Sequence, residues 1–191
     1  KKHKKKVIVF AEDVAASGGY WLACAADEIF ASKASIIGSI GVVSSGFGFD
    51  KAIDKIGIDR RLYTSGENKA ILDPFLPENK DDVKRLKAIQ KELHNQFISF
   101  VKSRRGSKIT NKDKDVFTGA FWSGEKSLDL GLIDSFGEMK FILKERFGED
   151  VKIKEFAPKK KFFGLGNLFS GAVDVLIYKV EERISFKRFG L

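Results

Sequence analysis

The sequence has one cysteine and two histidines among 191 residues, which narrows the chemistry that the chain can carry. A single cysteine, Cys24, excludes an internal disulfide and leaves no cysteine pair for a structural zinc site. Within its alanine-rich segment we expect Cys24 to be a small buried residue of a helix rather than a reactive thiol. The sequence therefore predicts neither a metal nor another cofactor.

A run of about 18 apolar residues, the length that a membrane-spanning helix needs, is also absent. The charge-free stretch from Ala34 to Phe49 is shorter and is rich in glycine and serine. The first residue is Lys1 and the only methionine is Met139. We therefore expect further sequence before Lys1, with any membrane anchor in it.

Acidic residues are outnumbered, since 35 Lys+Arg oppose 26 Asp+Glu and give a formal net charge of +9. Much of the excess lies in residues 1–6, 159–161 and 187–188. Such clusters can contact anionic lipid or nucleic acid. They lack the aromatic and groove-reading residues of nucleic-acid modules, so no nucleic-acid partner is predicted. A hydrophobic fraction of 43% indicates a folded chain with one substantial domain.

Predicted strands and helices alternate along the chain. Residues 7–10 and 28–31 have the apolar composition of buried strands, and a glycine turn and a helix over 20–26 lie between them. The further expected elements are a strand and loop over 36–49, helices over 50–56, 78–105, 123–131 and 139–147, and strands over 59–64, 132–133 and 151–156. This order predicts an α/β fold.

Ser17 lies in the glycine turn, in the segment Val14-Ala-Ala-Ser-Gly-Gly-Tyr20. A serine at a tight turn between a strand and a helix can project its hydroxyl, while Gly18 and Gly19 let the backbone approach a substrate carbonyl. This pattern is typical of a catalytic nucleophile. By itself it also fits an ordinary loop or a helix cap.

A serine nucleophile needs a general base, which is usually histidine. His3 lies in the basic leader and His94 lies on a largely polar helix face, so neither is well placed. Lysine serves instead where burial lowers its pKa enough to leave a neutral amine. Lys69 precedes Ala70-Ile-Leu72, which favours a partly apolar setting, although a solvated loop lysine fits the same residues.

A second serine-lysine pair, in Ser123-Gly-Glu-Lys126, has the spacing of the Ser-x-x-Lys motif of penicillin-binding enzymes. Its companion motifs are missing from the sequence. Ser123 fits better as the N-cap of a short helix, and we reject this pair as a catalytic site.

Several motifs, in order and spacing, resemble those of the signal peptide peptidase A (protease IV) family of serine peptidases. They are Asp13-Val-Ala-Ala-Ser-Gly-Gly-Tyr20, Ala25-Ala-Asp27, Gly38-Ser-Ile-Gly-Val42, Ser65-Gly-Glu-Asn-Lys69, residues 119–122 and Gly131-Leu-Ile-Asp134. The resemblance spans about residues 7–156. It implies that Ser17 is the nucleophile and Lys69 the general base. It further implies that Ser39 orients the lysine and that the Gly18 N–H stabilises the oxyanion.

The resemblance also implies a crotonase/Clp-protease-like fold of strand-strand-helix repeats, whose N-terminal part we expect before Lys1. Residues 1–157 would then be the C-terminal, catalytic portion of the domain. Residues 158–191 would be a basic linker and an amphipathic helix.

The function that this resemblance implies is an ATP-independent serine endopeptidase with a Ser-Lys dyad, which hydrolyses hydrophobic peptides such as cleaved signal peptides. It also implies a ring- or dome-shaped homo-oligomer at the bacterial inner membrane, anchored by a preceding segment, with the catalytic domain on the extracytoplasmic side. We expect Phe47, Phe49 and residues 74–76 to line the cleft. The alternative is an inactive scaffold subunit of the same fold that binds peptides or membrane.

Overall fold

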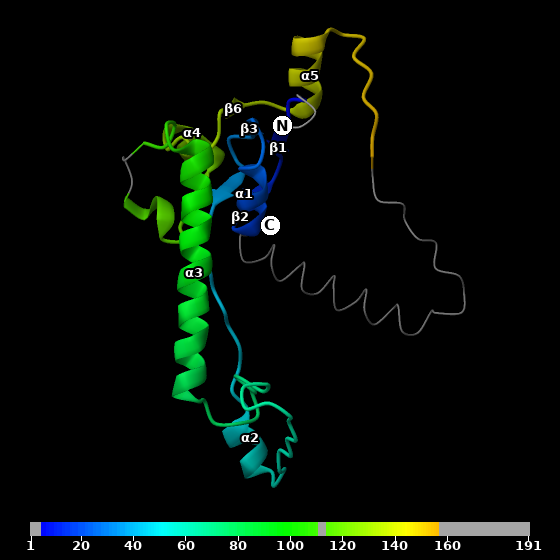
Figure 1. Ribbon diagram of the computed structural model, residues 1–191. Helices are drawn as coiled ribbons and strands as arrows, with labels where there is room; N and C mark the ends of the chain where they lie inside the picture. The colour runs from blue at the N-terminus through cyan, green and yellow to red at the C-terminus, as the bar shows by residue number, and fades with distance from the viewer. Residues whose placement is uncertain (1–4, 111–113, 157–191) are drawn as a thin grey trace, which may run out of the picture. The chain divides into compact units, whose positions relative to one another are not determined.

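The computed structural model describes residues 5–110 and 114–156 (Figure 1). The chain divides into two units, Lys1–Met139 and Lys140–Leu191. The boundary predicted at residue 158 and the amphipathic helix predicted after it lie outside the described residues. Among the helices of the described ranges, none has both the length and the apolar character needed to span a bilayer.

Two successive strand-strand-helix units open the chain. The first consists of β1 (Ile8–Ala11), β2 (Val14–Ala16) and α1 (Gly18–Ala23), and the second of β3 (Glu28–Ala31), β4 (Ile36–Gly38) and α2 (Asp50–Lys55). β1 pairs in parallel with β3, and β2 pairs in parallel with β4. The predicted α/β fold with strand-strand-helix repeats is therefore confirmed.

Two later strands extend these pairs into two small sheets. β5 (Phe121–Ser123) pairs antiparallel with β4, and β6 (Ser135–Phe136) pairs in parallel with β3. The strand orders are β1-β3-β6 and β2-β4-β5. Both sheets thus combine a strand from each repeat with a strand from much later in the sequence.

The long helix α3 (Lys80–Arg105) forms as predicted. The Asn79 side chain accepts a hydrogen bond from the Asp81 N–H at 2.8 Å and caps the first turn. Acidic residues occupy the first turn and basic residues the last, which matches the helix dipole.

The core of the first unit lies where the later half of α3 meets α1 and the strands. Trp21 of α1 stacks on Phe97 of α3, with ring centroids 4.4 Å apart and an interplanar angle of 11°. Tyr20 is fully buried, and its hydroxyl donates to the Leu132 carbonyl at 2.8 Å. Burial of large apolar side chains of this kind contributes about 1.5–3 kcal/mol each, so this core fixes α1 against α3.

Two shorter helices also form near their predicted positions. α4 (Gly124–Asp129) begins after Ser123, whose hydroxyl accepts from the Lys126 N–H at 3.3 Å. This contact is the predicted N-cap. α5 (Met139–Phe147) is followed by Glu149, which pairs with Lys144 at 2.8 Å.

The strand predictions for residues 59–64 and 151–156 are wrong, and the strand expected at 132–133 forms instead at Ser135–Phe136. Strands are stabilised by pairing with a neighbour more than by their own composition. None of the described strands offers 59–64 or 151–156 a partner. Leu132 and Ile133 are buried in a bend before β6, so their apolar character reflects the core rather than a strand.

Candidate active site

Ser17 occupies a strained turn between β2 and α1. Its φ is 52° and its ψ is −123°, a conformation that suits glycine and costs a residue with a side chain about 1–3 kcal/mol. The Ser17 N–H donates to the Gly38 carbonyl at 2.8 Å, and the Ser17 carbonyl accepts from the Trp21 N–H at 3.0 Å. Ser17 is exposed. An exposed serine on a strained strand-to-helix turn has the geometry of a nucleophile elbow.

Ser39 lies beside Ser17 because the two strands that precede these serines end in register. Ala16 of β2 pairs with Gly38 of β4, so the next residue of each strand begins a turn at the same edge. Ser39 also has a φ of 52°, and its N–H donates to the Ala120 carbonyl at 2.7 Å. In the described ranges, the residues other than glycine with positive φ are Ser17, Ser39 and Leu72. Two of these three are serines predicted for the site.

Gly18 and Gly19 open the first turn of α1 and face free space. A Cβ atom built on either glycine meets no heavy atom within 4 Å, so packing within this chain does not require glycine at either position. The first N–H groups of a helix have no partner within that helix. The Gly18 and Gly19 N–H groups are in this position, so neither has a partner within α1.

Lys69 lies in a different part of the first unit. It is exposed and belongs to the turns of residues 65–72, where its N–H donates to the Gly66 carbonyl at 3.2 Å. These turns and the start of α3 enclose a cavity of about 500 Å³, with Asp82 and Arg85 in its lining. The partly apolar setting expected for Lys69 is not provided by a single copy of the chain.

The separation between Lys69 and the serines follows from α3. α1 contacts α3 at Phe97, 12 residues after Arg85 (97 − 85), a rise of about 18 Å in an α-helix. Figure 1 shows α2 beside the start of α3, whereas α1 lies beside its later half. One copy of the chain therefore brings together Ser17, Gly18 and Ser39 but does not bring Lys69 to them.

Residues 42–79, which we call the arm, expose many large apolar side chains. Tyr63 is 90% exposed and Phe47 is 81% exposed. Phe49 contacts both Phe47 and Phe75, with ring centroids 6.1 and 5.6 Å apart. The aromatic residues predicted to line a cleft thus form an exposed cluster on the arm. Exposed apolar clusters of this kind mark interaction surfaces.

A cavity of about 500 Å³ lies at the carboxyl ends of β1, β3 and β6. Sequence reasoning did not identify it. Its lining includes Phe10, Phe136 and Met139, with Glu12 and Glu138 as its carboxylates. The carboxyl ends of parallel strands are a common place for ligands in α/β proteins, and the strand-strand-helix order was the signal available for it.

The other candidate side chains of the sequence have structural contacts. His94 is half-buried, and its Nε2 lies 3.0 Å from the Ile40 carbonyl oxygen, while His3 lies outside the described residues. Cys24 is fully buried, and burial raises the pKa of its thiol to about 11, so the thiol is protonated at neutral pH. The prediction that Cys24 is a small buried residue is confirmed, although it lies at the C-cap of α1 rather than within the helix.

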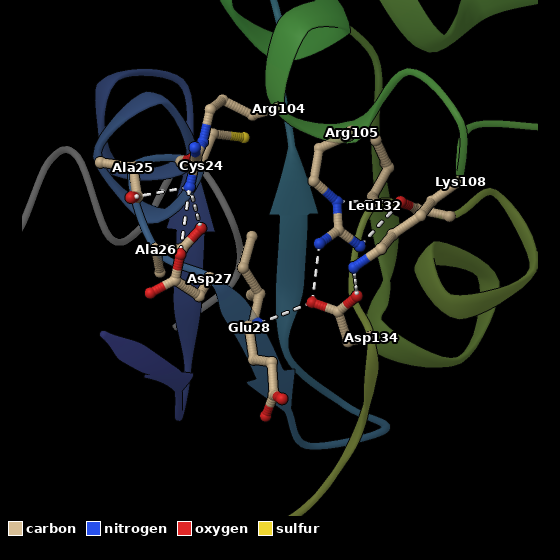
Figure 2. A network of polar contacts seen from close by, with 12 residues as sticks. Cys24, Ala25, Ala26, Asp27, Glu28, Arg104, Arg105, Lys108, Leu132 and Asp134 are labelled. Atoms are coloured by element: carbon tan, nitrogen blue, oxygen red, sulfur yellow. Dashed lines mark hydrogen bonds and ion pairs between the residues drawn. The ribbon is translucent and has the colours of Figure 1, made fainter. Parts of the chain in front are cut away.

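A partly buried ion pair ties the end of α3 to the strands (Figure 2). Arg105 donates twice to the Gly131 carbonyl, at 3.1 and 2.9 Å, and once to Asp134 Oδ2 at 2.7 Å. Asp134 also accepts from the Ile29 N–H at 2.8 Å and pairs with Lys108. Partial burial by itself raises the pKa of the Asp134 carboxyl, but the hydrogen bonds from Arg105, Lys108 and Ile29 outweigh burial and hold that pKa below its ordinary value.

The neighbouring Arg104 contacts a different element. Its Nε donates to the Cys24 carbonyl at 2.9 Å, and its Nη2 donates to the Ala25 and Ala26 carbonyls at 3.1 and 2.7 Å. These three carbonyls follow directly after α1. The sequence showed Arg104 and Arg105 only as basic residues of a helix end, and their partners are too distant in sequence to be inferred from spacing.

Comparison with known proteins identifies relatives along the whole chain. A protein from Brucella abortus named Na(+)/H(+) antiporter NhaA is 47% identical over 205 residues, which is 100% of this chain and 28% of that protein. The probable protease SohB of Buchnera aphidicola is 36% identical over 157 residues, 82% of this chain and 46% of that protein. The putative signal peptide peptidase SppA of Enterococcus faecium is 29% identical over 126 residues, 66% of this chain and 36% of that protein.

This chain spans less than half the length of each of these relatives. A solved structure of a mutant 1510-N membrane-bound stomatin-specific protease with a substrate peptide is similar at 18% identity and a TM-score of 0.46, over 88% of this chain and 70% of that chain. The family model of peptidase family S49 matches residues 1–174. The chain therefore belongs to peptidase family S49, and the predicted similarity to signal peptide peptidase A is confirmed.

Proposed function

We propose that this chain carries the catalytic residues of a serine endopeptidase in which Ser17 is the nucleophile and Lys69 the general base. The observation that carries the proposal is the strained turn at Ser17, which presents an exposed serine at the start of a helix. Strain of this kind persists only where the surrounding structure holds it, and it is frequent at active sites. Membership of a peptidase family supports the same assignment.

In the proposed reaction, Ser17 Oγ attacks the carbonyl carbon of the scissile bond and Lys69 Nζ takes the hydroxyl proton. The Gly18 N–H donates to the oxygen that becomes negatively charged. Collapse of the tetrahedral intermediate breaks the C–N bond, and Lys69 returns the proton to the leaving amine. Water then attacks the carbonyl carbon of the Ser17 ester while Lys69 takes a proton from it, and Lys69 passes this proton to Ser17 Oγ as the ester C–O bond breaks and the acid product leaves. Ser39, next to Ser17, accepts a hydrogen bond from the lysine amine and orients it.

The proposed dyad requires a homo-oligomer. Within one copy, Asn68 and Ala70, the neighbours of Lys69, line a cavity with Arg85 of α3, and Arg85 lies about 18 Å along α3 from Phe97, where α1 makes contact. Its arm exposes Phe47 and Tyr63, which suits burial against a second copy. We propose that Lys69 of one subunit reaches Ser17 of another, where contact between the subunits also buries the amine and favours its neutral form.

Hydrophobic peptides, such as cleaved signal peptides, are the proposed substrates. The apolar lining of the cavity formed by Phe10, Phe136 and Met139 supports this choice. Along the chain, Glu12 in the lining of this cavity is followed by β2, which ends next to Ser17. The relative named as a putative signal peptide peptidase supports the same substrate class. We propose a location at the bacterial inner membrane with the catalytic domain on the extracytoplasmic side, as for the family that the sequence resembles.

Labelling with a fluorophosphonate probe, which reacts with activated serines, tests the nucleophile and the base. In the full-length protein we expect no labelling of Ser17→Ala. We expect labelling of Lys69→Ala to fall by about 100-fold or more because the general base is lost. Ser103→Ala and Lys87→Ala change an exposed serine and an exposed lysine of α3 and serve as matched controls with normal labelling. Normal labelling of both Ser17→Ala and Lys69→Ala would refute the dyad.

A further inference from the structure

We infer that Arg104 is a positioning residue for the nucleophile, which it aligns by holding the opposite end of α1. This inference rests on the proposed role of Ser17. Three hydrogen bonds of 2.7–3.1 Å join the Arg104 guanidinium to the carbonyls of Cys24, Ala25 and Ala26 (Figure 2). The Asp27 carboxylate lies 3.8 Å from Arg104 Nη2 and balances its charge.

The contacts of Arg104 matter because α1 is short. A helix of six residues does not form by itself in water, so its position is set by the elements that bind it. The carbonyls that Arg104 binds belong to Cys24, the C-cap of α1, and to the two residues after it, so these contacts hold the turn in which α1 ends. A guanidinium is a planar fork of five N–H donors, which suits several carbonyls at once, and its positive charge complements the helix dipole at this end.

The geometry of α1 transmits this restraint to Ser17. Residues 18–23 span about 9 Å, so a tilt at the carboxyl end moves the first turn by a comparable angle. The buried side of α1 is held by Tyr20 and by the stack of Trp21 on Phe97. These two contacts restrain the middle of the helix, and Arg104 restrains its end. Together they hold Ser17 and the Gly18 N–H in one orientation.

Arg105 provides a natural comparison for Arg104. The two arginines are adjacent on α3 but point to different elements, as Figure 2 shows. Arg105 contacts Gly131 and Asp134 and is 3% exposed, so it stabilises the fold as a whole. Arg104 is 23% exposed, and its hydrogen bonds and its ion pair go to the end of α1 and to Asp27. Loss of Arg104 should therefore disturb α1 without unfolding the protein.

The test is peptide hydrolysis by the full-length protein with Arg104→Met, Arg104→Lys and the control Lys91→Met, which removes an exposed cation from the same helix. For Arg104→Met we expect kcat and the rate of fluorophosphonate labelling to fall by about 10–100-fold, because a misplacement of about 1 Å has effects of this size. We expect KM to change less than about threefold, since the substrate surfaces are retained. Arg104→Lys should recover part of kcat, and Lys91→Met should behave as wild type.

Hydrogen exchange in the Ser17→Ala background separates this inference from the proposed function. Adding Arg104→Met to Ser17→Ala should speed amide exchange in residues 18–26 and leave α4 unchanged, whatever the catalytic role of Ser17. If Ser17→Ala remains active, the proposed nucleophile is wrong. If Ser17→Ala is inactive but folded Arg104→Met retains kcat within about twofold of wild type, positioning by Arg104 is refuted. If Arg104→Met does not fold, Arg104→Lys is used in its place, and a kcat of this variant within about twofold of wild type refutes positioning by Arg104.

Discussion

At the scale of single residues, the site is marked by backbone conformation as well as by side-chain type. Ser17 and Ser39 share a φ of 52°, and hydrogen bonds to Gly38 and Ala120 hold their turns. Each strained residue costs about 1–3 kcal/mol. Retaining serine where glycine would fit more easily is explained if the hydroxyl is needed at that place. A variant with glycine in place of Ser17 should therefore be relieved of this strain.

Ser17→Gly should be more stable than Ser17→Ala by about 1 kcal/mol in urea unfolding. Relief of about 2 kcal/mol of strain exceeds the loss of about 1 kcal/mol from the greater freedom of glycine in the unfolded chain. Both variants should lack activity. At Ser44, an exposed loop position without positive φ, the order of the glycine and alanine variants should be reversed. Equal or lower stability of Ser17→Gly would contradict strain at this turn.

At the scale of elements, the later part of α3 organises the first unit. Its packing on α1 and the ion pair of Arg105 with Asp134 join three segments that are distant in sequence. Asp134 joins two elements. Its carboxylate accepts one hydrogen bond from the Ile29 N–H of β3 and another from Arg105 at the end of α3. Removing one partner of a buried ion pair leaves the other uncompensated and costs about 3–5 kcal/mol.

Asp134→Asn should lower the free energy of unfolding at neutral pH by about 3 kcal/mol, measured by urea denaturation. The folded pKa of Asp134 is below its ordinary value, so its contribution is complete above the unfolded pKa of about 3.9. That contribution is lost as the pH falls through the lower folded pKa. The difference between wild type and variant should therefore shrink below about pH 4.

The exposed Asp129 provides a control for this pH dependence, because Asp129→Asn should change stability by less than about 0.5 kcal/mol. A difference between wild type and Asp134→Asn that stays constant from about pH 6 to pH 2 would show that the ionised carboxylate does not act as described.

Local features of this fold could be predicted from the sequence, whereas its long-range contacts could not. The turn at Ser17, the N-cap at Ser123 and the extent of α3 follow from glycine, capping and periodicity. Residues 59–64 form no strand because none of the described strands pairs with them. The contacts of Arg104 and Asp134 join residues many positions apart, and no local pattern determines them. Motif order suggested Lys69, but the position of its side chain depends on how the arm folds.

At the scale of the whole molecule, the arm is the feature that a single copy does not explain. It places Lys69 beside the start of α3, away from Ser17, and exposes Phe47 and Tyr63 to solvent. Both observations are accounted for if subunits share their active sites. A homo-oligomer of this kind gives each site a serine from one copy and a lysine from the next.

Complementation between inactive subunits tests the shared dyad most directly. Full-length Ser17→Ala and Lys69→Ala proteins are produced separately and coexpressed, and peptide hydrolysis is measured for each sample. Each variant alone should be inactive. Coexpression at equal levels should restore about a quarter of wild-type activity, since a site then pairs an intact serine with an intact lysine in about one case of four. Coexpressed subunits that assemble but stay inactive would contradict a dyad formed between copies.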